Sequence, residues 1–237
     1  MRSFKLLQAI ALVWLAFAGV SFAQSGVRGE PEAVAAAMRI LDQAGGAAAW
    51  RSRTFAVEER GFLRTGETAD LRISRDLTRG ARVLERRTPG VHFIEWLSPE
   101  EGWSARNGVL TPMSAQELAI ELQGLRQEPY AIYHRLANND ADLRVELRDN
   151  NSALYVYDRG ERLLCWFLIW PNGVMHAWGN FYDGAINQHY YGPTADMGDA
   201  NLPRWGVALN GAFRFEYVRA RMSNEPLAEP EAGEGNG

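Results

Sequence analysis

The sequence predicts a mainly β protein of the α+β class, built on about eleven antiparallel strands in a sandwich or a barrel. Three observations support this prediction. Short runs with period-two alternation of apolar and polar residues recur after Trp50, and turn residues separate them. Most connections are too short for the crossover helices that a parallel sheet requires. Two segments, one before the first strand and one in mid-chain, have the apolar spacing of amphipathic helices.

Residues 1–23 have the pattern of a signal peptide. Met1–Lys5 is basic, Leu6–Val20 is apolar, and the small residues Ser21 and Ala23 fit a cleavage site after Ala23. The apolar run is short for a membrane span, which needs about 20 residues. The residue directly after the cleavage site is Gln24 and not a cysteine, so no lipoprotein anchor is expected. We therefore expect a soluble, exported, periplasmic protein without an integral membrane segment.

The rest of the chain has the length of one domain. We expect that domain over residues 24–224, followed by a disordered acidic tail over 225–237. Removing Arg2 and Lys5 from the 25 basic residues leaves 23 against 29 acidic ones, a net charge of −6. This balance, without a basic stripe, argues against nucleic acid as a partner. Cys165 is the only cysteine, so no intramolecular disulfide can form.

The first helix is expected to begin at Glu30-Pro31-Glu32, because proline and acidic residues favour the first turn. Its apolar stripe comprises Val34, Ala37, Met38 and Leu41, and Gly45-Gly46 should end it. Strands follow. Phe55, Val57 and Leu63 share one face of the first strand, with Glu58 and Arg60 on the other, and Leu71, Ile73 and Leu77 alternate with polar residues in the next. Further strands are expected near residue 83, over 93–97 and over 103–106.

A helical insert then interrupts the strands. Ser114 and Glu117 form an S-x-x-E capping box, and the leucines at 118, 122 and 125 form the apolar stripe. Gly124 and Pro129 should break this helix before a short continuation over residues 130–136. Amphipathic helices in this position would act as a lid on the sheet.

The remaining strands include a stretch that is rich in aromatic residues, 162–191, and a closing hairpin over 204–221. Leu163–Trp170 is apolar at eight consecutive positions, so both faces of that strand must be shielded from water. In the last strand Phe213, Phe215 and Tyr217 share one face.

Catalytic patterns are scarce. His92, His134, His176 and His189 lack metal-ligand spacing. There is no nucleophile elbow and no phosphate loop or dinucleotide fingerprint. Adjacent Glu58 and Glu59 should point to opposite faces of their strand, which excludes an acid–base pair. We therefore expect no enzyme, no cofactor and no metal. A hydrolase using His176, His189 and Asp183 is the weakest alternative.

Aromatic residues stand out, with tryptophan at positions 50, 96, 103, 166, 170, 178 and 205. These side chains either fill the sheet's own concave face or line a cavity for an apolar ligand beneath the helices. The candidate cavity residues are Phe55, Val57, Ile73, Trp96, Leu118, Leu122, Trp166, Phe213 and Phe215.

Three segments resemble the periplasmic lipoprotein-carrier family, LolA/LolB-like. RILDQAGGAAAW (39–50) is similar to its helix-to-strand entry, GWSARNGVLTPMSAQELA (102–119) to its Trp strand and lid helix, and LPRWGVALNGAFRFEYVRARMSNEPL (202–227) to its closing hairpin. The resemblance implies an eleven-stranded, incompletely closed barrel whose hydrophobic concave face, covered by helices, binds lipid or acyl groups. The acidic tail departs from the family pattern.

Two functions remain open. The first is a soluble periplasmic binding or carrier protein for lipid, acylated protein or another apolar ligand. The second is a non-enzymatic interaction or envelope-sensing protein with a self-filled core and an envelope protein as its partner. The first predicts an internal cavity and the second a dry, close-packed concave face.

Overall fold

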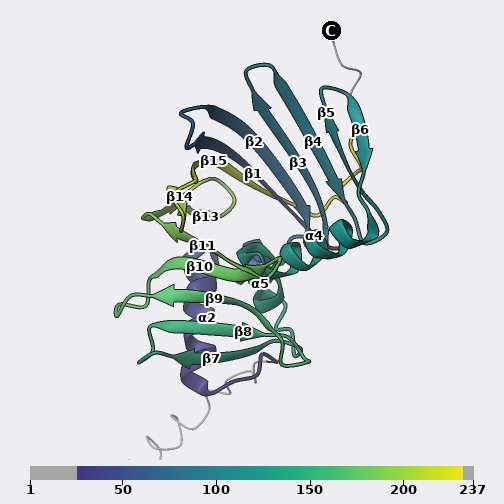
Figure 1. Cartoon of the computed structure of the whole chain (residues 1–237). Coiled ribbons are helices and arrows are strands. Elements are labelled where there is room, and N and C mark those ends of the chain that lie inside the picture. The colour runs from purple at the N-terminus through teal and green to yellow at the C-terminus, as the bar shows by residue number, and fades with distance from the viewer. Residues whose placement is uncertain (1–25, 232–237) are drawn as a thin grey trace, which may run out of the picture.

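The structure, a computed structural model, describes residues 26–231. The predicted signal peptide and residues 232–237 lie outside the described residues. Within 26–231 the chain forms four helices and fifteen strands, which confirms a mainly β, antiparallel protein (Figure 1). No helix in this part of the chain is long and apolar enough to cross a membrane.

Thirteen strands form one antiparallel sheet in the order β6-β5-β4-β3-β2-β1-β15-β14-β11-β10-β9-β8-β7. Its first meander is β1 (Thr54–Leu63), β2 (Thr68–Asp76), β3 (Ala81–Thr88), β4 (Val91–Leu97), β5 (Gly102–Arg106) and β6 (Val109–Pro112). The second part is β7 (Arg144–Arg148), β8 (Ala153–Tyr157), β9 (Leu163–Ile169), β10 (Met175–Tyr182), β11 (Ala185–Tyr191), β14 (Trp205–Ala208) and β15 (Phe213–Ser223). A separate hairpin pairs β12 (Thr194–Asp196) with β13 (Asn201–Pro203).

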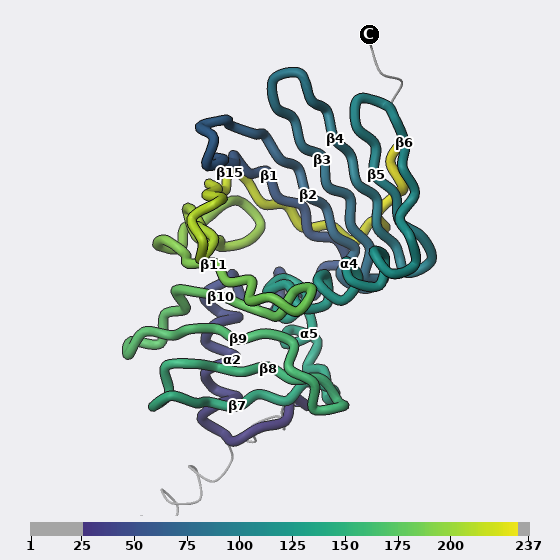
Figure 2. Tube along the Cα trace, in the orientation of Figure 1, coloured from purple at the N-terminus to yellow at the C-terminus, as the bar shows by residue number. Residues whose placement is uncertain are grey.

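The sheet is open and has thirteen strands, so the expected incompletely closed barrel of about eleven strands is not confirmed. Its two edges are β6 and β7, and the chain passes from one edge to the other through the helices α4 (Ala115–Gln127) and α5 (Pro129–Ala137) (Figure 2). The edges therefore do not pair with each other. We call the face that packs against the helices the inner face and the opposite one the outer face.

The N-terminal helices cover the second part of the sheet. α2 (Pro31–Gln43) buries Ala33, Ala37 and Leu41 and packs across β7 and β8. After Gly45, which has a φ of 111°, the chain turns into an unexpected short helix, α3 (Gly46–Trp50). Its last residue is fully buried, and the Trp50 indole donates to the Ala44 carbonyl at 2.8 Å.

The predicted capping box of α4 is confirmed. The Glu117 amide donates to Ser114 Oγ at 3.2 Å, and the Ser114 amide donates to the Glu117 carboxylate at 2.7 Å. The predicted break at Gly124 is wrong, because the helix continues to Gln127 and ends where Pro129 forces Glu128 into an extended conformation. Gly124 instead makes room for a ring, since a Cβ there would lie 2.9 Å from the Tyr182 side chain.

Both faces of β9 are shielded, as its unbroken apolar run requires. Cys165 and Phe167 are fully buried in the main core beneath the helices. On the outer face the Trp166 ring packs against Phe181 at a centroid distance of 5.4 Å and lies over Gly179, where a Cβ would be 2.5 Å from the indole. Neighbouring strands thus cover the second face of β9.

A second apolar cluster lies on the outer face of β3–β5, with Trp96 and Trp103 at its centre. Instead of the disorder expected from residue 225, the segment 225–231 runs along this cluster. Leu227 packs against it, and the Trp103 indole donates to the Glu229 carboxylate at 2.8 Å.

Candidate functional site

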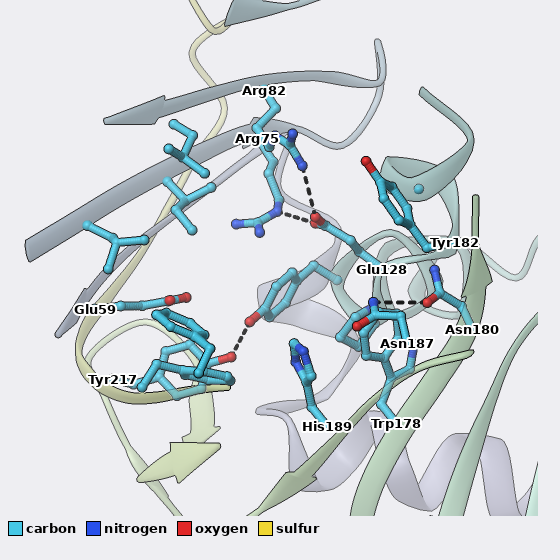
Figure 3. A pocket seen from close by; sticks show the side chains of 18 of the residues that line it. Glu59, Arg75, Arg82, Glu128, Trp178, Asn180, Tyr182, Asn187, His189 and Tyr217 are labelled. Atoms are coloured by element: carbon cyan, nitrogen blue, oxygen red, sulfur yellow. Dashed lines mark hydrogen bonds and ion pairs between the residues drawn. The ribbon is translucent and has the colours of Figure 1, made fainter. Parts of the chain in front are cut away.

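A cavity of about 410 Å³ lies on the inner face, between the sheet and the junction of α4 with α5 (Figure 3). Both parts of the sheet contribute to it: β1, β2 and β3 from the first meander, and β10, β11 and β15 from the second. Its lining residues are Glu59, Leu71, Ile73, Arg75, Arg82, Leu84, Glu121, Gly124, Glu128, Pro129, Tyr130, Trp178, Asn180, Tyr182, Asn187, His189, Tyr191, Phe213, Phe215 and Tyr217.

One wall of the cavity is apolar. Ile73 on β2 lies opposite Leu84 on β3, and the period-two alternation of each strand directs both side chains to the inner face. Phe213 and Phe215 alternate with polar residues on β15, and their rings stack at 5.7 Å. Gly206 on β14 leaves the space that the Phe215 ring occupies, because a Cβ there would lie 2.3 Å from the ring.

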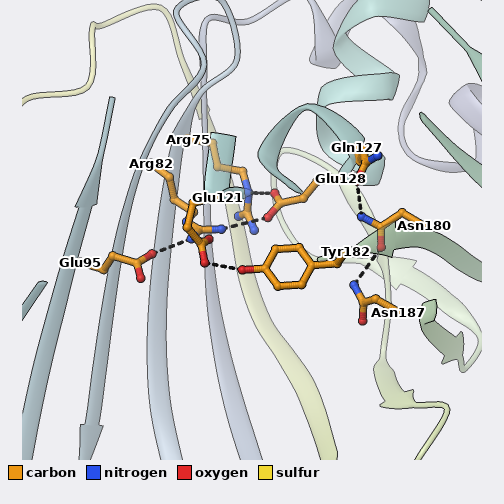
Figure 4. Close-up of polar contacts among 9 residues, drawn as sticks. All are labelled: Arg75, Arg82, Glu95, Glu121, Gln127, Glu128, Asn180, Tyr182 and Asn187. Atoms are coloured by element: carbon orange, nitrogen blue, oxygen red, sulfur yellow. Dashed lines mark hydrogen bonds and ion pairs between the residues drawn. The ribbon is translucent and has the colours of Figure 1, made fainter. Parts of the chain in front are cut away.

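Further along β2 and β3, an ion-pair network ties the sheet to the helices (Figure 4). Arg82 on β3 donates to Glu95 at 2.5 Å, to Glu121 at 2.9 Å and to Glu128 at 3.4 Å. Arg75 on β2 also donates to Glu128, and its guanidinium lies 4.5 Å from the centroid of the Tyr130 ring. All three carboxylates that surround Arg82 therefore have an ion-pair partner.

Polar side chains of β10 and β11 hold the end of α4. The Trp178 indole donates to the Gln127 carbonyl at 3.2 Å, and the Asn180 amide donates to the Gln127 side chain at 2.9 Å. Asn187 donates to Asn180 at 3.0 Å, and the Tyr182 hydroxyl donates to Glu121. Burial, followed by the hydrogen bond to Glu121, raises the pKa of Tyr182 above its usual value.

Glu59 is different from the other charged residues of the lining. It lies in the middle of β1, paired in register with Leu71 and Tyr217, and is only 7% exposed. Within residues 26–231 its carboxyl group has no hydrogen bond and no ion pair. Burial raises the pKa of Glu59 to about 7, although the charge of Arg75 opposes this shift. Figure 3 shows its carboxyl group directed into the cavity, toward the Tyr217 side of the lining.

Two tyrosines stand near Glu59. The hydroxyls of Tyr130 on α5 and Tyr217 on β15 share a hydrogen bond. Burial is the main reason why the pKa of each is raised above its usual value, and the charge of Glu59 adds to it. Both hydroxyls therefore stay neutral at physiological pH.

The predicted acid–base residues are not brought together as a set. His189 lines the cavity between Trp178 and Phe215, with ring centroids 5.8 and 5.6 Å away, and burial lowers its pKa. His176 instead stacks on Trp170 at 3.9 Å and does not belong to the cavity lining, while Asp183 lies exposed in a turn. No group of three or more histidine, cysteine, aspartate or glutamate side chains in the described part of the chain is arranged to hold a metal ion.

The structure places the predicted cavity residues in four different locations. Ile73, Phe213 and Phe215 line the cavity. Phe55 and Val57 lie in the main core, outside the lining, and Leu118 and Leu122 are half-buried on α4, also outside it. Trp96 and Trp166 lie on the outer face, because their strand registers direct them away from the helices.

The charged residues of the cavity were not predicted as site residues. Their signal is the same alternation that identifies the apolar ones. Glu59 occupies the next inward position after Phe55 and Val57, and Arg75 occupies the next one after Leu71 and Ile73. A charged residue at an inward-facing strand position marks a candidate functional residue.

A second cavity of about 350 Å³ lies beyond the Arg75–Glu128 pair, which lines both cavities. Its lining holds five arginines, and four of them are paired with acidic residues: Arg75 with Glu128, Arg79 with Glu100, Arg135 with Asp140, and Arg162 with Asp158.

The sequence matches no protein-family model and no curated relative. Among solved structures, an uncharacterized conserved protein from Thermus thermophilus is similar over 80% of this chain and 89% of its own, with 16% sequence identity and a TM-score of 0.36. A likeness of this degree supports no argument about fold or function.

Proposed function

We propose that this chain is a non-enzymatic binding or carrier protein that holds a lipid, an acyl chain or another partly apolar ligand in the inner-face cavity. The observation that carries the proposal is the cavity itself. Its volume of about 410 Å³ falls within the range of small-molecule sites, and aliphatic and aromatic side chains make up one wall. A self-filled inner face, which the interaction alternative expects, would leave no such space.

The arrangement of the walls suits an elongated, amphiphilic ligand. Leu71, Ile73 and Leu84 would contact the apolar part, while the charged and hydroxyl groups near Tyr130 would contact a polar end. The resemblance to periplasmic lipoprotein carriers motivates the same proposal. The signal peptide that we expect at the N-terminus lies outside the described residues. It would direct the protein to the periplasm, where the ligand would be bound and released.

The test is binding of a fluorescent acyl probe to delipidated protein, comparing Leu84→Trp with the parent chain. The indole at position 84 should fill the apolar end of the cavity and weaken probe binding at least about tenfold. Arg72→Trp is the matched control, because Arg72 is exposed on the outer face of the neighbouring strand. The proposal fails if the parent protein binds no probe, or if both variants bind it equally well.

A further inference from the structure

Glu59 is the one charged residue of the cavity lining that forms no ion pair within the described residues. The others are paired: Arg75 with Glu128, and Arg82 with Glu121 and Glu128. Glu59 is 7% exposed, and its neighbours in register are Leu71 and Tyr217. Burying an unpaired carboxylate is unfavourable, and buried charges in proteins are therefore normally paired or hydrogen-bonded. A ligand in this cavity can supply the missing partner.

The charge balance of the lining indicates which partner fits. The lining holds three glutamates, Glu59, Glu121 and Glu128, against two arginines. Both arginines are already paired with carboxylates, although Arg75 Nη1 and Arg82 Nε are buried without a hydrogen-bond partner among the described residues. Arg82 contacts three carboxylates, and the Arg75 guanidinium is committed to Glu128 and to the face of the Tyr130 ring. The uncompensated charge of the cavity is therefore negative.

The surroundings of Glu59 also suit a cation with several donors. The hydroxyl oxygens of Tyr130 and Tyr217 are acceptors, and the ring of Phe215 lies 5.2 Å from that of Tyr217. An ammonium group carries three N–H donors, and aromatic faces attract it. A carboxylate or phosphate in the same place would be repelled by Glu59.

We propose that Glu59 anchors the protonated amine of an amphiphilic ligand, whose apolar part lies against Leu71, Ile73 and Phe213. This inference rests on the proposed binding function and adds the chemical class of the ligand's polar end.

The test compares three probes with the same alkyl chain and different ends: dodecylamine, dodecanol and dodecanoate. Calorimetric titration below the micellar range, at about pH 8, keeps the amine protonated and Glu59 ionised. We expect dodecylamine to bind the delipidated protein about tenfold or more tightly than dodecanol, because only the ammonium group forms a charge-assisted hydrogen bond with Glu59, and we expect dodecanoate to bind most weakly.

Substitutions at two positions of β1 complete the design. Glu59→Gln should reduce dodecylamine affinity to that of dodecanol and leave dodecanol binding unchanged. Glu58→Gln, on the outer face of β1, should change nothing. If the Glu59→Gln variant does not fold, Glu59→Leu replaces it in the comparison of dodecylamine with dodecanol. Dodecanoate binding as tightly as dodecylamine, or a preference for the amine that survives both Glu59 substitutions, overturns this inference and leaves the binding function standing. If none of the three probes binds, both fail.

Discussion

Glu59 sets a pH dependence on the stability of the protein. Its pKa is about 7 in the folded protein and near the ordinary value of 4.5 when the chain is unfolded, and burial is the main cause of the difference. Between these two pH values the folded state binds the proton more tightly, so its stability falls as pH rises and levels off above about pH 7. The groups that face Glu59 are Arg75 on β2, Glu128 between the helices, Tyr130 on α5, Tyr191 on β11 and Tyr217 on β15.

We expect Glu59→Gln to be more stable than the parent protein by about 3 kcal/mol at about pH 8, with the difference shrinking toward zero near about pH 4. The reason is that glutamine never becomes charged in the apolar surroundings. Urea denaturation of both proteins across this pH range measures the difference. A stability difference that is independent of pH would contradict the assignment of the shift to Glu59.

At the residue scale, the alternation along each strand predicts which charged residues face the cavity as well as which apolar residues do. Alternation correctly places Phe213, Phe215 and Ile73 on the cavity side, and it also directs Glu59 and Arg75 there. The partners of these charges cannot be predicted, because Glu128 and Glu121 come from helices whose position against the sheet is not encoded locally. The outward positions of Trp96 and Trp166 could not be predicted either, because an aromatic residue fits either face of a sheet that is covered on both sides.

The helix α4 depends on its N-terminal cap, because only part of its surface is buried. Its buried residues are Gly124, Leu125 and Gln127, all in the last turn, so the first turn relies on Ser114 and Glu117. We expect Ser114→Ala to destabilise the protein by about 1 kcal/mol. Chemical denaturation checks the value, with Gln116→Ala, an exposed position in the same turn, as the control. Equal effects of the two substitutions would show that the cap does not stabilise the helix.

Elements with a strong local signal are the ones that the sequence predicts well. The starts of α2 and α4 follow from proline and from the capping box. The helix α3 and the strand β6 have no such signal. The helix α3 has only five residues and begins with Gly46, and β6 has four exposed residues. The sheet is open because its edge strands, β6 and β7, do not pair with each other. No local sequence pattern specifies whether two edges that are far apart in sequence will meet.

The C-terminal segment contributes to the stability of the whole molecule. Leu227 and Glu229 cover the cluster of Trp96 and Trp103 on the outer face, and Thr54 donates to the Glu225 carbonyl at 2.6 Å. We expect removal of residues 226–237 to lower the free energy of unfolding by about 1–3 kcal/mol and to increase exposure of the tryptophans. Denaturation followed by tryptophan fluorescence measures both effects. Removal of 232–237 alone is the control, and an equal loss in both truncations would contradict a role for the covering segment.

The pairing of β1 with β15 determines when, during synthesis of the chain, the complete sheet can fold. These strands are the first and last of the chain, yet they join the two parts of the sheet at its centre, with Thr54 opposite Ser223. A nascent chain that lacks its final strand can form the meander β1–β6 and the meander β7–β11. The strand β15, which joins these meanders into one sheet, is then still missing. Contacts between residues so distant in sequence form slowly. The cavity, which takes its walls from both meanders, therefore comes into existence only after synthesis of the chain is almost complete.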